Sequence, residues 1–182
     1  MRALVLSLAL GWLAAADLAA VDLSGVYDDE GVILEMEGAR EGERMSFRAL
    51  LALEWDPARG AVLRGETTRF EIDQEEHRFH LVCQDEDKRV TWQGAWRRMA
   101  GYDFDAKRVK LLLRRPGEGG ETFLFLLSND GRENLLVVTI ERVEPGRLGV
   151  TRKPVGTVFF VRTGPRGGLT RWGDDGRVVR AR

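Results

Sequence analysis

The sequence predicts an all-β protein, an antiparallel up-and-down meander of about 8–10 strands. Three observations lead to this prediction. Apolar residues alternate with polar ones along most of the chain, which is the period of a half-buried strand. Turn sequences rich in Gly, Pro, Asn and Asp separate the alternating segments at short intervals. After residue 22, no segment combines helical periodicity with capping residues.

The first sixteen residues have the pattern of a secretory signal peptide. Arg2 precedes an apolar stretch that is shorter than the roughly 20 residues of a membrane span and that ends in alanines. Cleavage is expected after Ala16, with Ala20 as the second choice, and a buried N-terminal helix or an uncleaved anchor is the alternative. We therefore expect a periplasmic or secreted protein with no transmembrane segment after removal of the signal.

The mature chain is expected to form one β-domain over residues 17–163. Strands are expected at 23–27, 32–37, 45–56, 61–73, 77–84, 89–97, 109–113, 122–128, 135–143 and 156–162. In the segment 45–56, alternate residues place Phe47, Ala49, Leu51, Leu53 and Trp55 on one face. Closure of the meander into a barrel would remove its exposed edges, so a closed barrel is preferred and a β-sandwich is the alternative.

Two neighbouring segments show the alternation most clearly. Phe79, Leu81 and Cys83 share one face of the segment 77–84, and this phase predicts a buried, unpaired cysteine that packs as a small apolar residue. Trp92 and Trp96 share one face of the segment 89–97. Both faces are expected to point inward.

The charge is distributed unevenly along the mature chain. Six arginines and two aspartates give residues 162–182 a net charge of +4. The mature chain has 27 basic and 29 acidic side chains, so its net charge is −2 and residues 17–161 carry −6. An acidic body argues against a nucleic-acid-binding protein. Residues 164–182 are rich in Arg and Gly, and we expect a flexible tail that could attract an anionic surface.

A family resemblance rests on three positions. Gly25 and Tyr27 form a Gly-x-aromatic pair near the first strand, and Arg162 follows the last expected strand. This pattern resembles that of the calycins, which include lipocalins, avidins and fatty-acid-binding proteins. In those barrels the aromatic residue is usually Trp, and a late basic residue covers it. The resemblance implies a lipocalin-like barrel closed by Gly25, Tyr27 and Arg162, with an apolar interior able to accept a small ligand.

Motifs for catalysis and for metal binding are missing from the sequence. His77 and His80 are three residues apart, which on a strand places them on opposite faces, so no metal site is predicted. The acidic groups at 28–30, 75–76 and 85–87 lack the spacing of a calcium loop and are interpreted as solvated hairpin tips. No nucleophile motif or phosphate loop is present, so neither an enzyme nor a cofactor is predicted.

The aromatic residues are the remaining indication of function. The residues expected to converge inside the barrel and to contact a ligand are Trp55, Trp92, Trp96, Phe123 and Phe125. The leading hypothesis is an exported protein that binds a small hydrophobic or amphipathic molecule. The second is a non-enzymatic envelope or interaction protein in which these aromatic side chains fill the core. A third is an enzyme whose carboxylates meet only in the fold.

Overall fold

The computed structural model describes residues 21–54, 67–75, 78–97, 102–104, 108–117, 120–129, 134–146, 149–172 and 178–180. The expected signal peptide and Trp55 lie outside these residues. The described part is all-β apart from one short helix, α1 (Phe47–Leu51). The strands are β1 (Gly25–Asp28), β2 (Glu30–Met36), β3 (Arg44–Ser46), β4 (Arg69–Glu75), β5 (Arg78–Gln84), β6 (Val90–Arg97), β7 (Tyr102–Phe104), β8 (Val109–Arg114), β9 (Thr122–Ser128), β10 (Leu135–Gly146), β11 (Gly149–Gly164), β12 (Thr170–Trp172) and β13 (Val178–Arg180).

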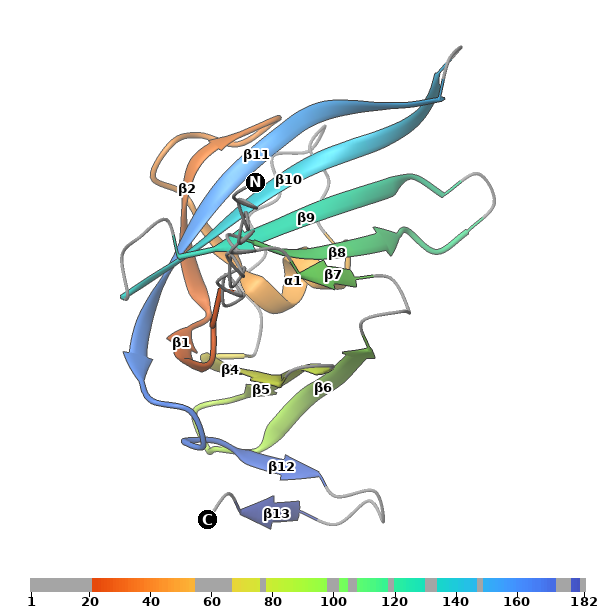
Figure 1. Cartoon of the computed structure of the whole chain (residues 1–182). Helices are drawn as coiled ribbons and strands as arrows, with labels where there is room; N and C mark the ends of the chain where they lie inside the picture. Colours follow the sequence, from red (N-terminus) through yellow and green to blue (C-terminus); the bar gives the residue numbers. More distant parts are fainter. Residues whose placement is uncertain are drawn as a thin grey trace, which may run out of the picture.

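One antiparallel sheet contains the first eleven strands. Its order is β6-β5-β4-β1-β11-β10-β9-β8-β7, with β2 paired to β11 and to β3. The long strand β11 joins two halves of this sheet, because its first part pairs with β10 and β2 and its last residues pair with β1. Figure 1 shows the half made of β2 and β7–β10 lying over the half made of β1 and β4–β6. The core occupies the space between the halves.

The antiparallel all-β sheet is confirmed, but its strand order is not that of a simple meander, since β1 pairs with β4 and β11 and not with β2, and a closed barrel is not supported. The sheet path ends at β6 on one side and at β7 on the other, and no pairing in the described part of the chain joins these two strands. They differ in length, since β6 has 8 residues and β7 has 3. The helix α1 also lies between the two halves (Figure 1), and its side chains form part of the core. A closed barrel would have to enclose this helix as well.

The strand expected over residues 45–56 is wrong for residues 47–54, because the chain forms α1 directly after Ser46, and residues 55–56 lie outside the described residues. The Ser46 hydroxyl accepts a hydrogen bond from the backbone N–H of Ala49 at 3.2 Å, which is an N-cap. Phe47, Leu50 and Leu51 are buried, and their spacing is that of one helix face. Phe47 and Leu51 also fit a period of two, so a short apolar run could not distinguish helix from strand.

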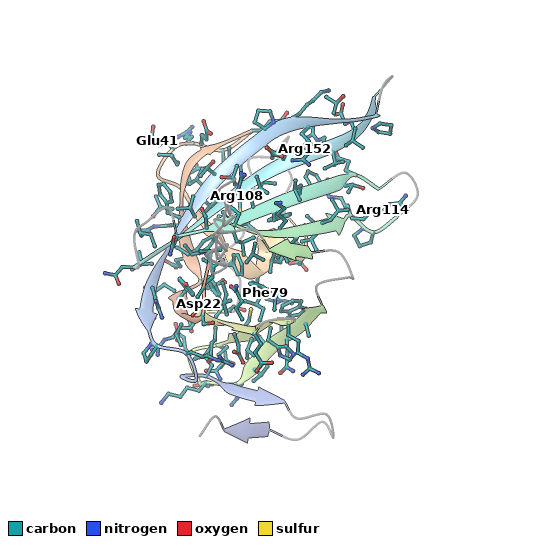
Figure 2. The ribbon with its side chains drawn as sticks, viewed as in Figure 1. Asp22, Glu41, Phe79, Arg108, Arg114 and Arg152 are labelled. Atoms are coloured by element: carbon teal, nitrogen blue, oxygen red, sulfur yellow. The ribbon has the colours of Figure 1, made fainter. Side chains whose placement is uncertain are left out.

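Within the described residues, the other strand predictions agree with the structure in kind and mostly in position, whereas residues 61–66 and 77 of the predicted strands lie outside those residues. Residues 122–128 form β9 as expected, whereas β10 and β11 extend beyond their predicted ends at 143 and 156. Inward-facing side chains from both halves are almost fully buried, including Phe79, Phe125 and Phe160. Figure 2 labels Phe79 between the two halves, where it is fully buried, and it also labels Arg114 and Arg152, which are exposed.

A second buried layer covers the outer face of β4. Glu71 has no exposed surface, and its two carboxylate oxygens accept hydrogen bonds from the backbone N–H groups of Gly167 (2.7 Å) and Leu169 (2.8 Å). Arg166 forms ion pairs with Asp73 and Glu75. We call residues 165–169 the C-terminal strap. These contacts hold the strap against the sheet. The sequence had predicted a flexible tail from residue 164 onward, which includes the strap.

The strap also covers apolar side chains on the same outer face. Glu71 lies opposite Val26 on β1 and opposite Val82 on β5, and both valines are buried. Leu169 itself is 5% exposed. Gly168 passes so close to Val26 that a β-carbon there would lie 2.8 Å from its Cγ2 atom. Both faces of this part of the sheet are therefore buried.

Candidate functional site

A pocket of about 500 Å³ opens beside the turn between β1 and β2. Side chains from five separate stretches of the chain surround it: Asp28, Asp29, Glu30, Arg44, Met45, Ser46, Thr67, Thr68, Glu86 and Val161. Four of these side chains are carboxylates and one is a guanidinium. The pocket has the volume of a small-molecule site, since such sites usually measure about 300–1,000 Å³.

Backbone hydrogen bonds around Asp29 bring these stretches together. The Asp29 N–H donates to the Thr68 carbonyl at 3.0 Å, which ties the turn to the residues before β4. The Asp29 carbonyl accepts from the N–H groups of Gly31 (3.2 Å) and Phe47 (3.3 Å). Asp29 thus connects the β1–β2 turn, the start of β4 and the first residue of α1.

The Asp29 side chain lies at the inner wall of the pocket and is only 1% exposed. Its Oδ1 atom accepts a hydrogen bond from the Arg48 N–H at 3.2 Å, and the Ser46 hydroxyl also bonds to the carboxyl group. Burial raises the pKa of Asp29 to about 6, while the hydrogen bonds from Ser46, Arg48 and Phe47 and the Arg48 charge oppose this rise. Asp29 can therefore exchange a proton in the range in which general acids and bases work.

The outer rim of the pocket carries exposed charges. Asp28, Glu30 and Glu86 are exposed carboxylates, and Arg44 is the cation among them. Arg44 donates a hydrogen bond to the Glu30 carbonyl at 3.4 Å. This excess of carboxylates gives the rim a negative potential, which favours a positively charged ligand.

Hydroxyl groups line the wall on the β4 side. Thr67 is 4% exposed, and its Oγ1 atom lies 2.9 Å from the Oγ1 atom of Thr91. The Thr68 hydroxyl donates to the Gln84 carbonyl at 3.4 Å. Hydroxyl groups can both donate and accept hydrogen bonds, so this wall can bind either a donor or an acceptor group of a ligand.

Gly25, Tyr27 and Arg162, the three positions on which the family resemblance rests, lie close together. Tyr27 pairs with Arg162 across β1 and β11, and a β-carbon on Gly25 would lie 3.0 Å from Arg162 Cζ. Arg162 donates to the Ser24 carbonyl at 2.7 Å. The Tyr27 hydroxyl donates to the Leu23 carbonyl at 2.8 Å, and burial raises the pKa of Tyr27 to about 12 although the Arg162 charge opposes this. This constellation fastens the first strand to the last residues of β11.

The aromatic residues that we expected to contact a ligand are divided between the two halves. Phe123 and Phe125 are fully buried on β9, and the Arg115 guanidinium lies 5.2 Å from the centre of the Phe123 ring. Trp92 on β6 is partly buried against the core, and Gly94 leaves room for its ring. Trp96 occupies the β6 position opposite Phe79. Trp92, Phe123 and Phe125 are not among the residues that line the acidic pocket.

The remaining reactive side chains do not form a site in the described residues. Cys83 is buried and forms no disulfide. Burial raises the pKa of its thiol, so Cys83 is suited to packing in the core and not to nucleophilic chemistry. His80 lies half-buried on β5, whereas His77 is outside the described residues. No group of three or more potential metal ligands occurs within the ranges given above, nor does any helix there have the length and apolarity of a membrane span.

The acidic pocket was not predicted from the sequence. The run 28–30 was interpreted as a solvated hairpin tip, which is correct for Asp28 and Glu30 and wrong for the buried Asp29. The pattern that distinguishes Asp29 is its phase, since Gly25, Tyr27 and Asp29 alternate toward one side. Thr67 lies just before β4 and Glu86 lies in the turn after β5, and neither shows a spacing relation to residue 29.

Comparison with protein-family models, with curated proteins and with solved structures gives no match to this chain.

Proposed function

We propose that this chain is an exported, non-enzymatic binding protein whose ligand is a small polar or amphipathic molecule with a positively charged group. The observation that carries the proposal is the acidic pocket of about 500 Å³ at the β1–β2 turn. Export follows from the signal-like N-terminus of the sequence. The sequence-based hypothesis placed a ligand in the interior of a barrel, whereas this proposal places it in the pocket at the β1–β2 turn.

The charge and shape of the pocket support this ligand class. Exposed carboxylates of Asp28, Glu30 and Glu86 outnumber the single guanidinium of Arg44. Val161 supplies apolar surface, since it lines the pocket and is 48% exposed. A cation with a short apolar part would therefore meet both a complementary charge and a surface to pack against.

The filled interior supports a site outside the sheet. Phe47 stacks on Phe70 at 4.1 Å between ring centres and meets the edge of Phe160 at 5.1 Å. Phe70 also stacks on Tyr27 at 5.2 Å. Side chains of α1 thus take the place in the interior that an apolar ligand would need.

The same filled interior favours a second candidate function. An envelope or interaction protein with a solid β-core would need no small ligand, and its surface would contact another macromolecule. The Arg-rich end of the chain would then bind an anionic partner. Arg166 is less available for that role because it is paired with Asp73 and Glu75.

Titration with charge-matched probes tests the proposal. Choline, agmatine and spermidine serve as cationic probes, glucose as a neutral probe and citrate as an anionic probe, each added to isotope-labelled mature protein. We expect the cations alone to shift the amide signals of residues 28–30, 46 and 67–68, and more weakly at high salt because the rim charges are screened.

A matched pair of variants locates the binding. Glu86→Gln removes a rim carboxylate, whereas Glu41→Gln removes an exposed carboxylate that is absent from the pocket lining (Figure 2). Glu86→Gln should weaken cation binding, and Glu41→Gln should not. Equal responses in both variants, or no shift with any cation, would reject the pocket as the binding site and leave the second candidate.

A further inference from the structure

The exposed large apolar side chains of the described residues gather on one side of the sheet. There are four of them: Leu34 (44%), Leu112 (51%), Val150 (68%) and Val161 (48%). On β2, β8 and β11, the residue just before the exposed one is fully buried in the core, namely Ile33, Leu111 and Phe160. Because successive side chains of a strand point to opposite faces, Leu34, Leu112 and Val161 all point away from the core.

Strand pairing joins these positions into one surface, which we call the apolar patch. Leu112 lies opposite Leu124 on β9, which is 7% exposed. Phe159 on β11 lies opposite Val137 on β10 and opposite Val32 on β2, and all three are half-buried. The apolar patch therefore runs without interruption across β2 and β8–β11.

The β10–β11 hairpin extends the apolar patch beyond the neighbouring strands. Residues 144–146 and 149–154, which we call the arm, pair only with each other in the described part of the chain and project past the end of β2 (Figure 1). Val150 lies opposite Pro145, which has the outward phase of β10. A two-stranded hairpin without a further layer is only marginally stable in water. The arm would therefore gain stability from a surface that covers Val150.

The charges beside the apolar patch are balanced. Glu141 follows the buried Ile140 and so points outward, where it forms an ion pair with Arg152 at 3.8 Å. Residues 17–161 as a whole carry a net charge of −6, which opposes contact with an anionic lipid surface. A surface that carries both signs side by side can instead match a copy of itself turned by a two-fold axis.

The size of the apolar patch suits a contact between two copies. It spans the five strands β2, β11, β10, β9 and β8, so the spacings within a sheet give it, with the arm, a projected area of roughly 600 Å². A stable interface takes about 800 Å² of accessible surface from each partner, and the accessible surface of side chains exceeds the projected area of their sheet. A contact that uses the whole apolar patch thus reaches the size of a stable dimer.

We propose that the apolar patch binds the apolar patch of a second copy of this chain, so that the mature protein is a two-fold symmetric dimer. The two sheets would stack face to face, as the layers of a β-sandwich do, with Leu112 and Phe159 in the contact and Val150 covered by the neighbouring subunit. Val161 also lines the acidic pocket, so the pocket would open at the edge of the contact. The dimer does not depend on ligand binding there.

Sedimentation velocity of the mature chain measures this association. Between roughly 1 µM and 200 µM, we expect the mass to reach that of two chains. Val150→Glu and Leu112→Glu should each weaken the dimer by more than about tenfold, because the two-fold axis brings two unpaired charges into the contact. Thr151→Glu is the matched control, since this exposed residue lies next to Val150 on the opposite side of the arm, and it should leave the dimer unchanged.

A chain that stays monomeric over this range overturns the proposal, whether or not it binds vesicles of phosphatidylglycerol and phosphatidylethanolamine. A dimer that Val150→Glu weakens no more than Thr151→Glu overturns it too. If the glutamate variants do not fold, amide signals of the wild-type protein decide: residues 34, 112 and 161 should shift between dilute and concentrated samples, and unresponsive signals would contradict the contact. Cation binding at the acidic pocket should persist in Val150→Glu, so the dimer and the ligand site are tested separately.

Discussion

The two faces of β4 are both buried, but by different chemistry. On the inner face, Phe70 and Ile72 are fully buried in the hydrophobic core. On the outer face, Glu71 and Asp73 lie beneath the C-terminal strap, and their carboxylates are matched to backbone N–H groups and to Arg166. Apolar packing buries Phe70 and Ile72, whereas the buried carboxylates of the outer face each have a hydrogen-bonding or charged partner.

This difference decides what each face tolerates. An apolar face loses stability in proportion to the volume that is removed, since neighbouring side chains only partly fill a cavity. A buried polar face loses stability when one partner is removed and the other is left without a hydrogen bond. Substitutions on the two faces should therefore differ in which replacement is tolerated, not only in magnitude.

The largest effect is expected for Phe70→Ala. The ring stacks on Tyr27 at 5.2 Å and on Phe47 at 4.1 Å and has no exposed surface. Its removal should lower the free energy of unfolding by about 3–5 kcal/mol, with a smaller loss for Phe70→Leu. Denaturant titration measures both, and a loss below about 1 kcal/mol for Phe70→Ala would show that the interior is loosely filled.

A somewhat smaller effect is expected for Glu71→Ala on the outer face. This change leaves the N–H groups of Gly167 and Leu169 without their acceptors, and should cost about 2–5 kcal/mol. The matched control is Glu75→Ala on the same strand, which removes an exposed ion-pair partner of Arg166 and should cost at most about 1 kcal/mol. Similar losses for the two variants would mean that the strap contributes no specific stabilisation through Glu71.

Truncation after Thr163 comes next in size. The composition of residues 164–182 predicts almost no loss, but the buried side chain of Leu169 predicts a loss of about 1.5–3 kcal/mol. Water can then hydrate Glu71, which limits the cost of losing its partners. Melting curves of the full and truncated chains distinguish the two expectations, and an unchanged melting temperature would show that the strap is dispensable.

The smallest effect on stability is expected at the pocket rim. Asp28 is exposed, and Asp28→Asn should change the free energy of unfolding by no more than about 0.5 kcal/mol. The same change should weaken binding of a cationic probe, because it removes one of the rim carboxylates. A stability loss as large as that of Glu71→Ala would show that Asp28 has a structural role and is not simply part of a binding surface.

Sequence alternation predicted the sheet well and predicted its second buried face poorly. Phe79, Leu81 and Cys83 were assigned to the interior because their phase is apolar, and all three are buried there. Glu71 and Asp73 have the phase of a solvated face, and nothing local in the sequence indicates that a segment almost 100 residues later covers them. Burial by a distant strap cannot be derived from periodicity.

The candidate site was harder to predict because it is assembled from five separate stretches of the chain. Three pocket residues, Thr67, Glu86 and Val161, are brought to the β1–β2 turn only by the pairing of β4, β5 and β11 around β1. The burial of Asp29 depends on α1, and the sequence favoured a strand at that position. Because the run Phe47–Leu51 was predicted as part of a strand, the contacts between α1 and Asp29 could not be predicted either.

The central claim is that the ligand site is the acidic pocket and not the interior. The most direct measurement is an NMR titration of the labelled mature protein with spermidine and, separately, with the apolar probe 1-octanol. Spermidine should shift the amides of residues 28–30 and 67–68, and octanol should leave Phe79, Phe123 and Phe125 of the interior unchanged. Octanol-induced shifts of those interior amides, with no response of the pocket to spermidine, would contradict the account.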